Sequence, residues 1–81
     1  MKVKLHFFAQ LKELIQEPEL ILESASPISC REASFYLGRQ YPGLIPILNQ
    51  CALARNGILA REDSILEDGD ELALLPPVSG G

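Results

Sequence analysis

The stretch ISCREASFYLGRQYPG, residues 28–43, decides the fold, because it holds the strongest helix signal in the chain. Ser29 and Glu32 form a capping box at the start of the helix, and Pro42-Gly43 ends it. Phe35 falls nearly opposite the face that is expected to pack. That face consists of Cys30, Ala33, Ser34, Leu37 and Tyr41. A sheet that buries one face against a single main helix gives a two-layer α+β domain.

On the N-terminal side, the sequence predicts two antiparallel strands joined through a short helix. Residues 2–8 alternate as a half-buried strand, and residues 9–16 have the apolar spacing of a helix that Pro18 ends. Residues 19–24 form the second strand. Phe8 breaks the alternation, because it falls on the polar face of the first strand. The apolar faces of the first strand and the helix consist of Val3, Leu5, Phe7, Leu11, Leu14 and Ile15.

On the C-terminal side, the sequence predicts three further strands, at residues 51–55, 58–60 and 71–75. Asn56-Gly57 is a strong hairpin signal between the first two of them. Residues 43–50 are apolar around Pro46 and predict a short irregular or 3₁₀ segment. Residues 61–71 predict a polar crossing with one apolar anchor, Ile65-Leu66, and a turn before the last strand.

These elements predict one topology. A long right-handed crossover through the main helix is compatible with parallel pairing of the first and last strands. The expected fold is therefore a ubiquitin-like β-grasp of the α+β class, with a mixed sheet of about five strands on one main helix. Residues 1–75 form the domain, and residues 76–81 form an extended, flexible C-terminal tail.

Composition excludes several classes of function. The chain has 81 residues, 47% of them hydrophobic and 22% charged, which argues against disorder. A net charge of −4 without a basic cluster provides no electrostatic footprint for nucleic acid or anionic membranes. No apolar run approaches the roughly 18 residues of a membrane span, and no secretory signal is present at the N-terminus. The sequence predicts a cytoplasmic protein.

The side chains offer no conventional active site. There is no glycine-rich nucleotide loop, no HExxH motif and no closely spaced Cys/His set, so no metal site is expected. His6 is the only histidine and is expected on the surface. Cys30 and Cys51 are expected to be small core residues, although a thiol of lowered pKa is the alternative for Cys30. Residues 62–71 lack the calcium-loop pattern and are expected to be a solvated crossing and turn.

The remaining candidate is the C-terminal sequence PPVSGG, residues 76–81. Pro76-Pro77 favours a stiff, extended neck, which Val78 and Ser79 continue, with a reach of roughly 20 Å. Gly80 and Gly81 have no Cβ, so this backbone fits a narrow channel. The terminal carboxylate, ionised at pH 7, is then the reactive group. An acyl-adenylate made from ATP would activate it, and sulfide transfer would leave a thiocarboxylate.

An apolar patch is expected beside the exit of this tail. Leu72 and Leu74 point inward on the last strand, so Leu75 points outward. If the first and last strands are parallel neighbours, their C-terminal ends coincide, which places Phe8 next to Leu75. Leu59, on the short strand predicted at residues 58–60, extends the patch. Such clusters mark partner surfaces, and the alternative is that the chain's own loops cover them.

Three stretches carry a resemblance to a known family: FFAQLKEL (7–14), ARNG (54–57) and EDGDELALLPPVSGG (67–81). They resemble the small subunit of molybdopterin synthase, the MoaD-type sulfur carrier. The terminal PPVSGG is the specific part, and the length and element order fit over the whole chain. One departure is that Leu74 and Leu75 precede the prolines where an aromatic residue is common.

The resemblance implies a non-catalytic, sulfur-donating subunit without a permanently bound cofactor. An E1-like adenylating enzyme of the MoeB type would activate Gly81 with ATP, and a sulfur donor would convert it to 1-thioglycine. The tail would enter a MoaE-type large subunit, which holds the active site, and pass its sulfur to precursor Z in molybdenum cofactor biosynthesis. Phe8, Leu59 and Leu75 match positions that contact the large subunit, and the implied assembly is a heterotetramer.

Three alternatives remain open from the residues. Another β-grasp carrier, for thiamine, tRNA thiolation or cysteine synthesis, would use the same tail chemistry. A ubiquitin-like modifier would form isopeptide bonds to lysines. An interaction module with an inert tail would be indifferent to the loss of Gly81.

Overall fold

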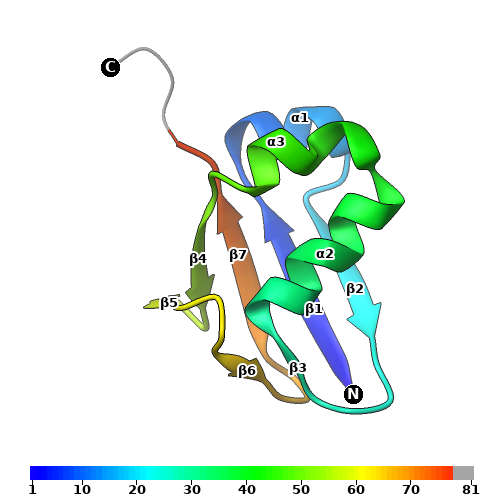
Figure 1. The fold of residues 1–81 in the computed structure, drawn as a ribbon, viewed down its shortest axis with the longest axis vertical. Coiled ribbons are helices and arrows are strands. Elements are labelled where there is room, and N and C mark those ends of the chain that lie inside the picture. The colour runs from blue at the N-terminus through cyan, green and yellow to red at the C-terminus, as the bar shows by residue number, and fades with distance from the viewer. Residues whose placement is uncertain (78–81) are drawn as a thin grey trace.

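The computed structural model describes residues 1–77 and contains a five-stranded mixed sheet in the order β2-β1-β7-β4-β5. Its strands are β1 (Lys2–Phe7), β2 (Glu19–Glu23), β4 (Ala52–Arg55), β5 (Ile58–Ala60) and β7 (Glu71–Leu75). The central pair β1 and β7 is parallel, and the other neighbours are antiparallel. The mixed sheet and the predicted pairing of the first and last strands are confirmed (Figure 1).

The main helix, α2 (Cys30–Gln40), crosses one face of this sheet (Figure 1). The predicted capping box is present: the Ser29 hydroxyl accepts a hydrogen bond from the Glu32 amide at 3.1 Å. The Ser29 amide in turn donates to the Glu32 carboxylate at 3.0 Å. Two backbone donors that the first helical turn leaves free are therefore paired.

The core lies between α2 and the sheet. The inward residues of β1, Val3, Leu5 and Phe7, are all buried, as the period-two alternation predicts. From the other elements, the fully buried side chains include Leu22, Cys30, Ala33, Leu37, Leu66, Leu72 and Leu74. Burial of this apolar surface is the main stabilising contribution to a chain of this size.

The first helix differs in detail from the prediction. Helix α1 (Ala9–Ile15) ends at Gln16, whose φ of 65° is left-handed and whose amide bonds to the Lys12 carbonyl. The helix therefore ends two residues before Pro18, so Pro18 is not what terminates it. Leu14, expected on the apolar face, is 57% exposed, so that part of the prediction is wrong. A helix of about two turns presents only a narrow stripe to the core, and Leu11 and Ile15 fill it.

A second, two-stranded sheet was not predicted. Strand β3 (Ile28–Ser29) pairs antiparallel with β6 (Ile65–Leu66), inside the segment expected to be a polar crossing. Leu66 is fully buried, which agrees with an apolar anchor there. Residues 43–50, expected to be irregular or 3₁₀, mostly form the 3₁₀ turn η1 (Pro42–Leu44) and the short helix α3 (Ile45–Leu48). Within residues 1–77, no helix is long and apolar enough to cross a bilayer.

Candidate functional site

The neck leaves the sheet at the end of β7, where Pro76 and Pro77 follow Leu75 directly. Because the central strands β1 and β7 are parallel, both finish at the same end of the sheet (Figure 1). The predicted reactive group lies outside the described residues, as do its neighbours in the tail. These tail residues are Val78, Ser79, Gly80 and Gly81.

Phe8 lies at this end of the sheet, beside Leu75. Its φ of −128° and ψ of 159° continue the extended backbone of β1, so its side chain points to the face opposite buried Phe7. Phe7 is in register with Leu74, which places Phe8 next to Leu75. Phe8 is 47% exposed and Leu75 is half-buried. Ala9 then turns the chain with a left-handed φ of 49°, a conformation of measurable cost for a residue with a Cβ.

Leu59 lies on the same outer face as Phe8 and Leu75, but its strand, β5, is not adjacent to β1 or β7. It is opposite Ala54 in β4, while Leu75 is opposite Ala52, and these two alanines share one face. Leu59 is thus two strand spacings, about 10 Å, from β7. Leu59 is 76% exposed and projects from one side of this face. The smaller side chains of the two alanines lie between it and Leu75. We call the set Phe8, Ala52, Ala54, Leu59 and Leu75 the exit patch.

A polar group borders the exit patch on the outer face of β1. His6 Nε2 is 2.8 Å from Glu71 Oε1, and His6 Nδ1 is 3.5 Å from Glu19 Oε2. The hydrogen bond with His6 is the main cause that lowers the pKa of Glu71, and Lys4 contributes a smaller Coulombic effect. His6 is therefore a surface residue, as expected, but it bridges two carboxylates. The side of the patch next to β2 is consequently polar and carries paired charges of both signs.

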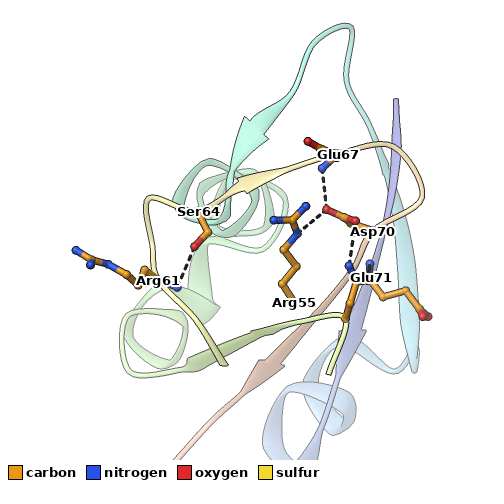
Figure 2. A network of polar contacts seen from close by, with 7 residues as sticks. Arg55, Arg61, Ser64, Glu67, Asp70 and Glu71 are labelled. Atoms are coloured by element: carbon orange, nitrogen blue, oxygen red, sulfur yellow. Dashed lines mark hydrogen bonds and ion pairs between the residues drawn. The ribbon is translucent and has the colours of Figure 1, made fainter. Parts of the chain in front are cut away.

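Buried Asp70 is the centre of a partly buried polar network that the sequence did not predict (Figure 2). Its carboxylate accepts hydrogen bonds from Arg55 Nε at 2.7 Å, Asn56 Nδ2 at 3.0 Å and the Glu67 amide at 2.8 Å. The turn containing Asp70 had been expected to be solvated, yet this residue is only 9% exposed, so that expectation is wrong for it. The sequence signal is the coincidence of Arg55-Asn56 with an Asp-Gly-Asp turn.

These bonds hold Asp70 in its ionised form and tie the hairpin to the last strand. The Glu67 amide is the main cause that lowers the pKa of Asp70, with further contributions from Asn56 and Arg55. Asn56 also exchanges two bonds with the backbone of Glu71, at 2.8 and 2.9 Å. The β4–β5 hairpin, which supplies one wall of the exit patch, is thereby fastened to β7.

The thiols and acidic groups provide no reactive centre in the described part of the chain. Cys30 is fully buried, and desolvation is the main cause that raises the pKa of its thiol, so the core prediction for this residue is confirmed. Cys51 is partly buried, burial raises its pKa, and its Sγ lies 3.3 Å from the Ile47 carbonyl oxygen. Among residues 1–77, no group of three or more His, Cys, Asp or Glu side chains is arranged to hold a metal ion.

The sheet order, the crossing helix and the parallel central pair define the protein class as ubiquitin-like β-grasp. A solved structure of SAMP1 from Haloferax volcanii superposes with a TM-score of 0.87 at 27% identity, covering 100% of both chains. The predicted fold class is confirmed by this likeness.

Within that class, the ThiS family matches residues 5–81, and the chain belongs to it. A molybdopterin synthase sulfur carrier subunit from Arabidopsis thaliana is 31% identical over 100% of this chain and 84% of the relative. A complex of subunits 1 and 2 of the molybdopterin-converting factor from Helicobacter pylori contains a chain that is 32% identical, with a TM-score of 0.69 and full coverage of both chains. The predicted membership among MoaD-type, ubiquitin-like sulfur carriers is thus confirmed.

Proposed function

We propose that this chain is the sulfur-carrying small subunit of a molybdopterin synthase and that Gly81 carries the sulfur. The observation that supports this most directly is the PPVSGG terminus, which begins immediately after a central strand of the sheet. The family membership supports it as well. In the described residues, the Cys30 thiol is buried, the Cys51 thiol is partly buried, and no side-chain group is arranged to hold a metal ion.

The proposed chemistry takes place at the terminal carboxylate. One carboxylate oxygen attacks the α-phosphorus of ATP and releases pyrophosphate, which gives an acyl-adenylate. A sulfur nucleophile at the oxidation level of sulfide then attacks the carbonyl carbon, AMP leaves, and a thiocarboxylate remains. An E1-like, MoeB-type enzyme binds ATP and provides the adenylation site, since the sequence contains no glycine-rich nucleotide loop. The thiocarboxylate sulfur then forms a bond to precursor Z. Water attacks the carbonyl carbon and breaks the acyl–sulfur bond, which leaves the sulfur on the substrate and restores the carboxylate of Gly81.

The proposed partner in that transfer is a MoaE-type large subunit. The relative from Helicobacter pylori supports this, because its structure is a complex of two subunits. We assign the contact to the exit patch, which lies where the neck leaves the sheet and exposes large apolar side chains. A cytoplasmic heterotetramer of two small and two large subunits completes the proposal.

Mass spectrometry of the intact protein tests the central proposal. After incubation with ATP, the cognate adenylating enzyme and a sulfur source, a fraction of the protein should gain about 16 Da, the difference between sulfur and oxygen, at Gly81. A control reaction without ATP should leave the mass unchanged. If the complete reaction never yields the heavier species, the chain is not a sulfur carrier.

A ubiquitin-like modifier is the second candidate, favoured by the likeness to SAMP1, since a related solved structure from Methanosarcina acetivorans is described as a small archaeal modifier protein. The adenylation step is shared, but the acyl group would pass to a lysine amine rather than to sulfide. This function predicts conjugates of higher mass in cell extracts that survive strong reductant and vanish when Gly81 is deleted.

The substitution Phe8→Asp should weaken binding to the large subunit by tenfold or more, about 1.4 kcal/mol, because it places a charge in the exit patch. The fold should survive, since Phe8 is 47% exposed. Calorimetric titration with purified large subunit measures the effect. Leu14→Asp is the matched control, because Leu14 is a similarly exposed apolar residue on α1, outside the patch. Equal affinities for both variants would remove Phe8 from the interface.

A further inference from the structure

A groove runs along α2 on the helix side of the sheet, on the opposite face from the exit patch. It has a volume of about 360 Å³ and is bounded by α2, the α3 region and β4. Leu48 and Leu53 line it and are nearly buried, with exposed fractions of 6% and 8%. Phe35 and Ile45 line it as well, yet they remain 66% and 45% exposed. The groove therefore has an apolar base between two protruding apolar walls.

Gly38 of α2 lines this groove and lets α3 pack closely against α2. A Cβ at this position would lie 3.1 Å from Ile45 Cγ1, closer than most such contacts. Glycine inside a helix costs about 1 kcal/mol relative to alanine, so its presence in the last turn of α2 is otherwise unfavourable. The absence of a side chain lets α3 approach α2 and leaves backbone, rather than a side chain, facing the groove.

The charge around the groove is opposite to that of the chain as a whole. At one end, Arg31 is paired with Glu62, with Nη2 and Oε2 2.9 Å apart. At the other end lies exposed Arg39, and no carboxylate within residues 1–77 comes within ion-pair distance of it. Two cations thus face one carboxylate on a protein of net charge −4.

We infer that this α2 groove is a second docking site, which takes the apolar face of an acidic amphipathic helix from a partner protein. The distance along α2 from Arg31 to Arg39 is about 12 Å, the length of two helical turns, and suits the helix-in-groove mode. Apolar side chains of the partner enter between Phe35 and Ile45, and one of its carboxylates pairs with Arg39. Aromatic residues and arginine are the side chains that contribute most at protein interfaces.

This inference does not depend on the proposed function of the tail. The groove and the exit patch lie on opposite faces of the sheet, so both can be occupied at the same time. A carrier that docks through its sheet face would thereby keep its helix face available for another protein. Deletion of Gly80 and Gly81 should accordingly leave binding in the groove unchanged.

Titration of the ¹⁵N-labelled full chain with synthetic peptides tests the inference. The probe is an amphipathic helical peptide with leucine on one face and glutamate on the other, and two matched peptides carry glutamine or lysine in place of glutamate. The amides of Ser34, Gly38, Ile45 and Leu53 should shift, and the glutamate peptide should bind about tenfold more tightly than the glutamine peptide. Shifts centred on the exit patch, equal affinities, or no binding would overturn the inference.

Charge exchange provides the sharper control. Arg39→Glu should reduce affinity for the glutamate peptide by about tenfold or more and should increase affinity for the lysine peptide. Lys12→Glu makes the same change in net charge at an exposed position on α1 and should have little effect. Phe35→Ser and Leu14→Ser form a second pair, since both residues are exposed and apolar but only Phe35 lines the groove. Equal losses within either pair, or self-association through the groove, would contradict the assignment.

Discussion

A chain that ends at Gly80 should fold normally but lose nearly all of its sulfur transfer. The loss should be at least about 100-fold, because truncation draws the carboxylate back by roughly 3.4 Å, and a misplacement of about 1 Å already costs that much in rate. Gly81→Ala should reduce transfer severely as well, since a Cβ obstructs a channel that accepts bare backbone. Intact-mass analysis of the sulfur-loaded product, followed by single-turnover transfer to precursor Z in the presence of the large subunit, separates loading from donation.

The fold of these variants should be unchanged. In the part of the chain that the structure describes, the buried core lies within residues 3–74, so thermal unfolding should match that of the parent chain. Ser79→Ala is the matched control for the tail, because it preserves the length and the terminal carboxylate, and it should transfer sulfur at close to the parent rate. Normal transfer by the chain ending at Gly80 would refute the assignment of the reactive carboxylate to Gly81.

Asp70→Ala should destabilise the protein by roughly 2–4 kcal/mol, the largest effect expected from a polar substitution here. The carboxylate accepts bonds from Arg55, Asn56 and the Glu67 amide, and its removal leaves these donors without their partner around a position that is only 9% exposed. For a domain of this size, the loss corresponds to a fall in Tm on the order of 15 °C. Urea or thermal unfolding measures it.

Asp63→Ala is the control for this experiment. Asp63 is exposed, and its ion pair is a 3.5 Å contact to exposed Arg61. Such surface pairs contribute about 0–1 kcal/mol, so the control should unfold near the parent midpoint. Equal midpoints for the Asp70 and Asp63 variants would show that the network does not stabilise the fold.

The same network predicts how stability depends on pH. Because the folded state lowers the pKa of Asp70, its unfolded state binds the proton more readily in acid. The stabilisation is therefore fully present above the ordinary carboxyl pKa of about 4 and is lost as pH falls through the folded value. Glu71, whose pKa is also lowered, contributes in the same direction. Asp70→Asn should flatten this acid limb of the stability curve.

Much of the fold was predictable because its signals are local. The alternation from Lys2 to Phe7 and the capping box at Ser29 each lie within a few residues of one another. Asn56 and Gly57 have the left-handed φ values, 51° and 84°, that their hairpin turn requires. The pairing of β3 with β6 was missed, because two-residue strands are too short to show a period.

The candidate site divides in the same way. The in-and-out alternation of side chains along two strands was sufficient to place Phe8 beside Leu75, once the parallel pairing of those strands was assumed. The burial of Asp70 was not predictable from its neighbours, because Arg55 and Asn56 reach it from a hairpin that is distant in sequence. The groove beside Phe35 was also missed, since its opposite wall is contributed by α3 and β4.

The sequence alone therefore determined the α+β class, the position of the main helix and the tail that begins at Pro76, because periodicity, capping and proline geometry are properties of adjacent residues. Only the tertiary structure decided which outward side chains share the exit patch, that Asp70 is a buried anchor and that α2 borders a groove. Those features depend on strand register and helix packing, which bring together residues that are far apart in the chain. The contacts that stabilise them are formed between distant segments, so no local sequence pattern encodes them.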